Sequence, residues 1–379
     1  MMSNIRAKIR ATVIVLAVGA PVFIGSPAHA AGWTTVPSPS EVPGDNYLYG
    51  VDASGASDVW AVGAFSFPHG GTRHGLVFRY DGVAWRVVPR AGLPGDEALR
   101  AVDVVSAADV WVVGDRRAGI IGSATVAAHW DGTAWTREPT PNGNPNGFNN
   151  LNGVAAAGGT VWAVGTYVDP NSSLNRRKLI LQRTGGGWRV SAAPTATAYE
   201  TLAAVDATGP ADAWAVGSAS SNIQSGPLAP LALRWNGTGW ASMSLPATGS
   251  TALTGVDART PSDVWAVGSS RGADGAQPYV ARFDGVSWRR VATPTFAGGG
   301  ELTDVVALSP STAVAVGRSN GAPLVLRWNG TSWTRETTPA SSNPFVTGAA
   351  AGGPDAVWAV GYRFELNAYS NRTLTMLGT

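Results

Sequence analysis

A five-residue apolar motif recurs seven times along this chain, at intervals close to fifty residues, and this repeat limits the possible folds more than any other feature. It reads VWAVG at 59–63, 161–165, 264–268 and 357–361, VWVVG at 110–114, AWAVG at 213–217 and AVAVG at 313–317. Self-similarity at a period of this length is typical of solenoids, propellers and other repeat arrays. The chain is therefore predicted to consist of seven similar structural units.

Two further motifs accompany each copy. An apolar run such as LYGVDA from Leu48 or LTGVDA from Leu253 precedes it, and a turn followed by Trp, such as YDGVAW or WNGTSW, follows the first six copies. Each repeat thus contains four short β-like runs, in the second repeat at roughly 99–105, 109–115, 124–130 and 134–138. No segment of helical period and length competes with them. Four strands per repeat predict an all-β fold of propeller blades, whose faces are covered by their neighbours.

Tryptophan occupies two fixed places in the repeat, and we predict that both sets form the structural core between blades. The first set consists of Trp60, Trp111, Trp162, Trp214, Trp265 and Trp358, with Val314 in the sixth copy, and the second of Trp33, Trp85, Trp135, Trp188, Trp240, Trp288 and Trp333.

The last repeat ends one strand short, and the segment at Trp33 has the sequence of the missing strand. We therefore predict a seven-bladed β-propeller of four-stranded antiparallel blades, closed by the N-terminal strand, because closure removes free sheet edges. The predicted blades span about 48–89, 99–139, 151–194, 202–246, 253–294, 302–339 and 346–377 plus 32–37, in a single domain of residues 31–379.

The repeat resembles kelch-type and galactose-oxidase-like propellers, and the VWAVG…DGTSW repeats of secreted bacterial proteins whose function is mostly unassigned. As in those families, the second strand ends at a Gly, and an aromatic residue and a Trp flank the next turn, as in Tyr80 and Trp85. The pattern departs from kelch repeats in having a single Gly, as at Gly63, and an aromatic-to-Trp spacing one residue shorter. The resemblance implies the fold, while the copper cofactor of galactose oxidase needs a cysteine that this chain lacks.

The first thirty residues have the features of a secretory signal peptide. A basic stretch precedes an apolar run at 11–25, and Ala28-His29-Ala30 is suited to cleavage after Ala30. A membrane anchor is the alternative, but the run is short for a span and Pro21 interrupts it. Removing residues 1–30 takes away three basic residues and no acid, which changes the formal net charge from +2 to −1. We expect a secreted monomer with no nucleic-acid partner and no membrane span after cleavage.

The loops between the second and third strands of each blade are long and irregular, whereas the turns on the opposite face are short and uniform. Binding loops diverge while scaffold turns stay regular, so we predict any site on the irregular face. Its loops at 64–75, 115–123, 166–178, 269–279 and 362–372 carry aromatic residues and arginines such as Arg73, Arg117 and Arg176.

Glutamates precede the first strand of three blades and are expected to ring the mouth of the central channel. Oxygen ligands of this kind could hold Ca²⁺ or accept hydrogen bonds from a sugar or an amine, and the alternative is that they are solvated loop acids. The candidate ligand-binding residues are Glu97, Glu200, Glu301, Asn149, Tyr49, Arg100, Tyr167 and Tyr362, together with Asn46 at the position equivalent to Asn149. No residue is predicted to be catalytic or to bind a metal.

Two periodic aspartates are interpreted as structural. One follows the first-strand Val, as at Asp52, and the other precedes the VWAVG motif, as at Asp58. Both are expected to accept hydrogen bonds from backbone N–H groups at the turn between the first two strands.

Three classes of function fit this pattern. The first is an extracellular binding module or scaffold that recognises a glycan or a protein through the irregular face. The second is a polysaccharide-directed hydrolase or lyase with acids at the channel mouth, and the third is a structural ring without a small ligand. The absence of cysteine excludes disulfides, thiolate metal sites and cysteine nucleophiles.

Overall fold

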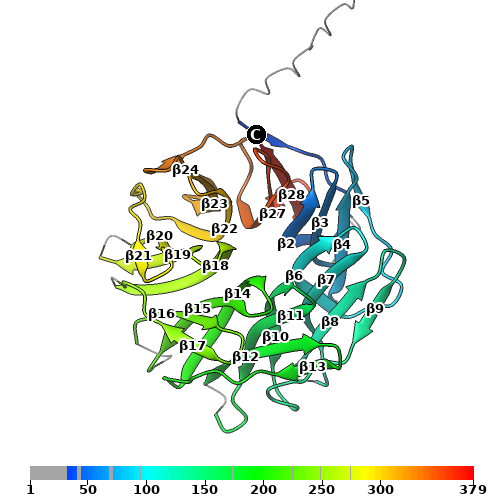
Figure 1. Cartoon of the computed structure of the whole chain (residues 1–379). Coiled ribbons are helices and arrows are strands. Elements are labelled where there is room, and N and C mark those ends of the chain that lie inside the picture. Colours follow the sequence, from blue (N-terminus) through cyan, green and yellow to red (C-terminus); the bar gives the residue numbers. More distant parts are fainter. Residues whose placement is uncertain are drawn as a thin grey trace, which may run out of the picture. The chain divides into compact units, whose positions relative to one another are not determined.

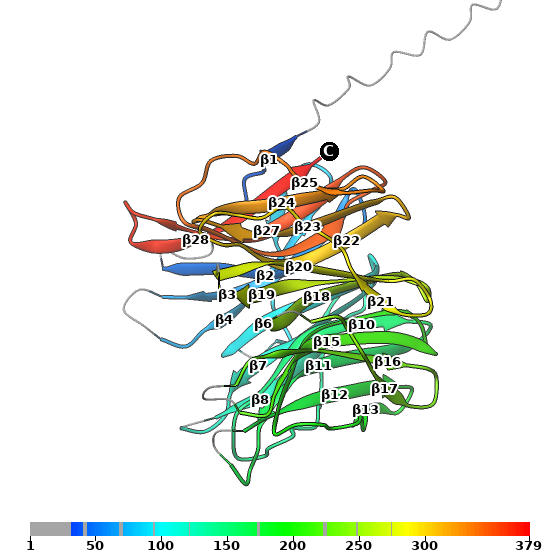
Figure 2. The same ribbon diagram turned by 90° about the vertical axis from the view of Figure 1, so that its left-hand side faces the viewer.

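The computed structural model is a ring of seven four-stranded antiparallel sheets, which is the architecture of a β-propeller (Figure 1). Residues of the inner strands line a central channel. It describes residues 32–40, 44–67, 71–93, 95–120, 122–172, 175–222, 226–247, 249–273 and 275–379. The predicted signal peptide lies outside the described residues. Figure 2 shows the ring from the side, where the strands run between its two faces.

The predicted fold class is therefore confirmed, with every blade built in the order inner strand to outer strand. The first three blades are β2 (Asp45–Gly55), β3 (Asp58–Ser66), β4 (His74–Tyr80), β5 (Trp85–Val87); β6 (Glu97–Ser106), β7 (Asp109–Arg117), β8 (Ser123–Trp130), β9 (Trp135–Glu138); and β10 (Asn149–Ala157), β11 (Thr160–Val168), β12 (Arg176–Thr184), β13 (Gly187–Val190). The next three are β14 (Tyr199–Gly209), β15 (Asp212–Ser220), β16 (Ala229–Trp235), β17 (Trp240–Met243); β18 (Ser250–Thr260), β19 (Asp263–Gly272), β20 (Gly275–Phe283), β21 (Trp288–Arg290); and β22 (Glu301–Ser309), β23 (Thr312–Ser319), β24 (Ala322–Trp328), β25 (Trp333–Arg335). The seventh consists of β26 (Pro344–Ala351), β27 (Val357–Glu365), β28 (Ser370–Gly378) and β1 (Trp33–Thr35).

The glycine that ends each VWAVG motif has a steric origin. The inner strand has a bulge opposite it, between Leu48 and Gly50 in the first blade. A Cβ atom on Gly63 would overlap with the backbone carbonyl of Tyr47, and the motif glycines of the other six blades meet the same obstacle. Only glycine allows the backbones to approach this closely.

The two tryptophan sets meet across the blade interfaces. The second-strand Trp of one blade contacts the fourth-strand Trp of the next in edge-to-face geometry, for example Trp214 and Trp288 with ring centroids 5.4 Å apart and planes at 89°. Five other interfaces repeat this pair, at Trp60–Trp135, Trp111–Trp188, Trp162–Trp240, Trp265–Trp333 and Trp358–Trp85. At the seventh interface Val314 stands in place of the second-strand Trp and packs in one cluster with Trp33. All thirteen of these tryptophans are at most 9% exposed.

The N-terminal strand closes the ring, as the sequence predicts. β1 pairs antiparallel with β28, with Trp33 opposite Gly378 and Thr35 opposite Met376. The indole Nε1 of Trp33 also donates a hydrogen bond of 2.7 Å to Glu336 of the preceding blade. Strands from both ends of the chain thus complete one blade. Within the described residues, no helix is long and apolar enough to cross a membrane.

Candidate functional site

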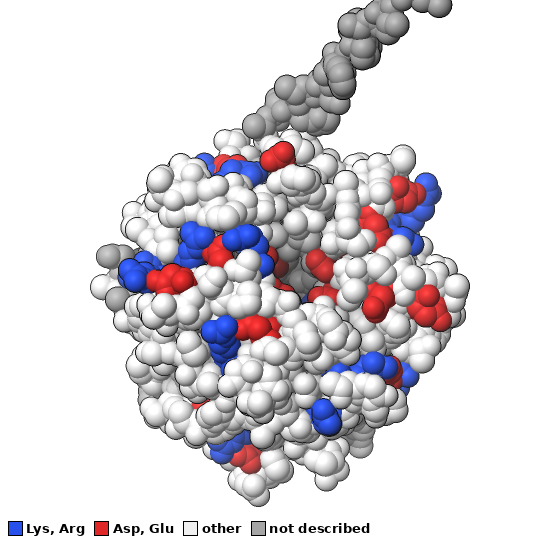
Figure 3. Space-filling model, viewed as in Figure 1, with Lys and Arg blue, Asp and Glu red and all other residues white. Residues whose placement is uncertain are grey.

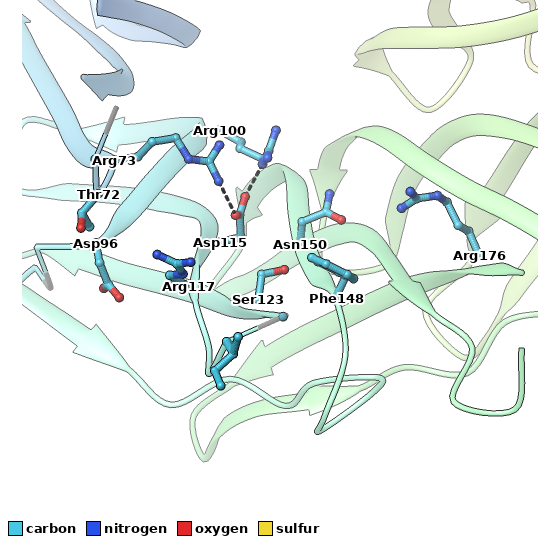
Figure 4. A pocket seen from close by; sticks show the side chains of 13 residues that line it. Thr72, Arg73, Asp96, Arg100, Asp115, Arg117, Ser123, Phe148, Asn150 and Arg176 are labelled. Carbon is cyan, nitrogen blue, oxygen red and sulfur yellow. Dashed lines mark hydrogen bonds and ion pairs between the residues drawn. The ribbon is translucent and has the colours of Figure 1, made fainter. Parts of the chain in front are cut away.

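A large cavity lies on the irregular face, where the first three blades meet (Figure 4). Its volume of about 610 Å³ is within the range of small-molecule binding sites. Strand ends and loops supply its polar and charged lining residues, which are Thr72, Arg73, Asp96, Arg100, Asp115, Arg117, Ser123, Asn150 and Arg176. Phe148 and Ile120 add apolar surface. We call this space the arginine cavity.

The propeller repeat explains why these side chains converge. β7 continues past its motif glycine and remains paired with β8, so Asp115 and Arg117 lie at the end of the sheet on the irregular face. Arg100 follows the first Leu of inner strand β6, and Arg176 begins β12 of the third blade. Residues from separate blades come together here because the loops between strands two and three all emerge on one face.

Asp115 neutralises part of the positive charge in the cavity. It is only 4% exposed. It accepts a hydrogen bond of 2.6 Å from Nε of Arg100 and forms a 3.4 Å ion pair with Arg73 (Figure 4). In the part of the chain that the structure describes, the guanidinium groups of Arg117 and Arg176 have neither an ion pair nor a hydrogen bond, and both residues are exposed. These two cations are therefore available to a ligand.

Aromatic residues continue this surface toward the channel mouth. Tyr47 and Tyr49 are stacked with centroids 6.0 Å apart, and Tyr362 meets Tyr47 edge-on at 4.8 Å. Tyr362 stacks on Phe345 at 5.1 Å, and the guanidinium of Arg318 covers Phe345 at 4.1 Å. Burial raises the pKa of Tyr49, although the positive charges of Arg100 and Arg73 oppose the shift. Tyr49 thus links the arginine cavity to the aromatic cluster.

Five aspartates from the inner strands line the central channel: Asp52, Asp103, Asp206, Asp257 and Asp304. The expected role of Asp52 in its own strand turn is wrong, because its carboxylate accepts a 2.6 Å hydrogen bond from the backbone N–H of Val104 in the next blade. Asp206, Asp257 and Asp304 make the same bond to the blade that follows each of them. Burial raises the pKa of Asp52 and of Asp304 to about 7.

The glutamates expected at the channel mouth occupy two different environments. Glu97 and Glu200 lie two residues before the first-strand Leu, and both are at most 1% exposed between blades. Glu200 binds Lys178 and accepts a hydrogen bond of 2.7 Å from the backbone N–H of Ala196. Both carboxylate oxygens of Glu97 lack a hydrogen-bond partner in the described structure, and burial raises its pKa to about 8.

Glu301 lies one residue later in the repeat than Glu97 and Glu200, so its side chain points to the opposite face of the sheet, because side chains alternate along a strand. It forms an ion pair with Arg318 at 2.5 Å and is partly exposed. The amide of Asn149 is buried and donates to the carbonyls of Asn144 and Gly147 in the preceding loop and to that of Ser123 at the start of β8. Asn46 is equally buried and donates to the carbonyl of Gly44.

Tyr167 does not line the arginine cavity, because it packs against the loop at Gly143. Of the candidate residues, Arg100 lies in the cavity, while Tyr49 and Tyr362 belong to the adjoining aromatic cluster. Among the described residues there is no group of three or more His, Asp or Glu suited to hold a metal ion.

The face with the short turns shows a feature that the sequence analysis did not predict. The backbone partners expected for Asp58, which precedes the VWAVG motif, are wrong, because its carboxylate accepts hydrogen bonds from side chains: Nε1 of Trp60 at 3.0 Å and Nε of Arg79 at 2.7 Å. The guanidinium of Arg79 also covers the Trp60 ring. Arg282 forms a similar set with Asp263 and Trp265. Figure 3 shows this face, where acidic and basic side chains lie next to one another and acidic side chains border the central hollow. These charges are mutually satisfied and serve the scaffold.

Comparison with solved structures places the molecule among β-propellers. The fold is similar to that of YCF48. The structure of YCF48 from Cyanidioschyzon merolae matches with a TM-score of 0.57 and 15% identity over 92% of this chain and 99% of that one. A structure of YCF48 bound to D1 peptide matches with a TM-score of 0.55 and 15% identity over 94% and 100% of the two chains.

An ulvan lyase from a polysaccharide lyase family, bound to a saccharide of GlcA and Rha3S, matches with a TM-score of 0.50 and 9% identity over 74% of this chain and 78% of that one. No protein-family model matches the sequence, and no curated protein matches it. At these identities the likeness shows the fold alone.

Proposed function

We propose that this chain is an exported binding module that takes up a negatively charged part of a glycan or a protein in the arginine cavity. The observation that carries the proposal is the pair of uncompensated cations, Arg117 and Arg176, in a cavity of about 610 Å³. Arginine presents a planar fork of donors that suits carboxylate and sulfate-like anions. Asp115 fixes the side chains of Arg73 and Arg100 through ion pairs, so these two lining residues are already in position before a ligand binds.

The predicted signal peptide and the repeat pattern support an extracellular role for such a module, and we group it on that pattern with secreted kelch-like propellers. Two propellers of similar fold have been solved with a bound ligand, which is a peptide in one and a saccharide in the other. The buried positions of Glu97 and Glu200 argue against these glutamates as an acid pair for hydrolysis, because neither faces the cavity. Binding is therefore the function that the geometry supports best.

The proposal is tested by measuring binding of the purified protein to anionic and neutral ligands at near-physiological salt, where weak surface attraction is screened. Heparin oligosaccharides, polyglutamate and dextran are suitable probes. We expect saturable binding of at least one anionic probe and none of dextran, and a loss of about tenfold or more in affinity for Arg117→Ala/Arg176→Ala. If the double variant bound the anionic probe with the same affinity as the unsubstituted protein, the cavity would not be the binding site.

A further inference from the structure

We infer that the ligand of the arginine cavity is an acidic polysaccharide, bound through a sugar unit that carries a carboxylate or a sulfate. This inference rests on the proposed function and narrows it from any anionic ligand to one chemical class. It follows from three kinds of side chain that line one cavity: cations without an ion pair, an exposed aromatic ring, and polar side chains that can bind to hydroxyls.

The cations define where the charge of the ligand lies. Arg73 and Arg100 already share the carboxylate of Asp115, so their charge is partly neutralised. Arg117 and Arg176 come from the second and third blades and form no ion pair with the described residues. Figure 4 shows them on opposite sides of Phe148. Anionic groups of the ligand are therefore expected on both sides of this ring.

Phe148 provides the apolar surface between the two cations. Its side chain is 53% exposed although it lines a cavity, and Ile120 at the rim is 90% exposed. Exposed aromatic surface in a concave, polar site is typical of ligand recognition. A sugar ring has an apolar C–H face that can cover the Phe148 ring while its edge carries charged and hydroxyl groups.

The remaining lining groups match hydroxyls. Asn150 donates one amide hydrogen to Asn152 and keeps a second donor and its oxygen acceptor, and the carboxylate of Asp96 offers acceptors. The hydroxyl of Ser123 already donates to the carbonyl of Asn149 and accepts from its N–H, so it offers one further acceptor. In the described structure the side chain of Asp96 has no ion pair, and it faces the same cavity as Arg117. A sugar hydroxyl both donates and accepts, so it can bind to each of these groups.

The geometry is less suited to an extended peptide. Peptides that add to a β-sheet bind to an open strand edge. The lining strands with such an edge are β6 and β10, and their inner edges border the central channel rather than the arginine cavity. The cavity itself is lined by loop and strand-end residues, so side chains rather than a row of backbone groups contact the ligand.

Isothermal titration calorimetry with four probes tests the inference: oligogalacturonate, heparin oligosaccharide, a neutral galacto-oligosaccharide and polyglutamate. We expect an acidic oligosaccharide to bind at least about tenfold more tightly than polyglutamate and the neutral sugar. Phe148→Ala should weaken this binding about tenfold or more, because the ring contacts the sugar face. Val190→Ala is the matched control, since Val190 is 57% exposed on outer strand β13 and away from the cavity.

The possible failures are distinguishable. If polyglutamate binds as well as the acidic sugars and Phe148→Ala has no effect, the inference is wrong while the proposed anion-binding function stands. If no anionic probe binds, both are wrong. If Phe148→Ala unfolds the protein, Phe148→Leu, which keeps apolar volume but removes the aromatic face, should still weaken acidic-sugar binding, and unchanged affinity would overturn the inference.

Discussion

Each second-strand tryptophan contributes to two blades at once, because it is enclosed by its own sheet and by the next. Trp214 is fully buried, contacts Trp288 and Phe283, and lies beneath the guanidinium of Arg234. Trp214→Ala should lower the free energy of unfolding by about 3–5 kcal/mol, through lost apolar burial and the cavity left behind. Chemical denaturation measures the change.

Tyr369→Ala is the control for this prediction, since Tyr369 is 85% exposed, and its effect should stay within about 0.5 kcal/mol. A similar stability for the two variants would mean that the tryptophan contacts do not hold the blades together.

The channel aspartates predict a pH dependence of stability. Burial raises the pKa of Asp52 and Asp304 from 3.8 to about 7, so the folded state holds these protons more tightly than the unfolded chain. Their contribution to stability is therefore largest at acidic pH and falls as the pH rises from about 4 to 7. Differential scanning calorimetry should show a lower Tm at pH 8 than at pH 5.

The variant Asp52→Asn/Asp304→Asn removes both titrations and keeps oxygen acceptors for Val104 and Ala349. The fall in Tm between pH 5 and pH 8 should be smaller in this variant. An unchanged slope would assign the pH dependence to other groups.

The first strand of the second blade begins with another buried acid whose pKa is raised. Burial raises the pKa of Glu97 from 4.5 to about 8. The folded state therefore loses stability as the pH rises above 4.5, the pKa of a free glutamic acid side chain. Glu97→Gln should therefore increase the Tm at pH 9 relative to the natural protein, and by more than at pH 6. Thermal unfolding at both values measures this, and a smaller gain at pH 9 than at pH 6 would contradict the buried ionisation.

At the scale of strands, the closure of the ring depends on three residues of β1. Without this strand the backbone edge of β28 would be open, and open edges favour association. Trp33→Ala removes the indole that packs with Val314 and binds Glu336, and we expect it to lower the Tm and to increase oligomers in size-exclusion chromatography.

Thr34→Ala changes an exposed side chain of the same strand and serves as the control. Equal behaviour of the two variants would show that β1 is not needed to hold the ring closed.

The repeat pattern predicted the strands well, because apolar motifs and turn residues are local signals. In the second blade the expected 109–115 is observed as Asp109–Arg117, and the N-terminal strand pairs where the missing strand was expected. The bulge beside Leu48 was not predictable, since it depends on the close approach of two backbones. The same environment was expected for Glu301 and Glu97, which is wrong: Glu97 is buried and Glu301 is partly exposed. A shift of one residue along a strand moves the side chain to the opposite face of the sheet.

At the scale of the molecule, the two faces of the ring have different chemistry. On the face with short turns, pairs such as Arg79–Asp58 are satisfied within the scaffold. On the irregular face, Arg117 and Arg176 form no ion pair with the described residues and lie beside exposed Phe148. The sequence showed that arginines occur in the irregular loops, but their convergence depends on how three blades are placed around the ring, which no local pattern encodes.

The central claim, that an anionic ligand binds on the irregular face, is tested most directly by charge reversal on each face separately. Arg117→Glu/Arg176→Glu and Arg86→Glu/Arg289→Glu change the net charge equally, and the second pair lies on strands that follow the short turns. We predict that binding of an acidic oligosaccharide, measured by calorimetry at near-physiological salt, is lost only in the first variant. An equal loss in both variants, or in neither, would contradict the account.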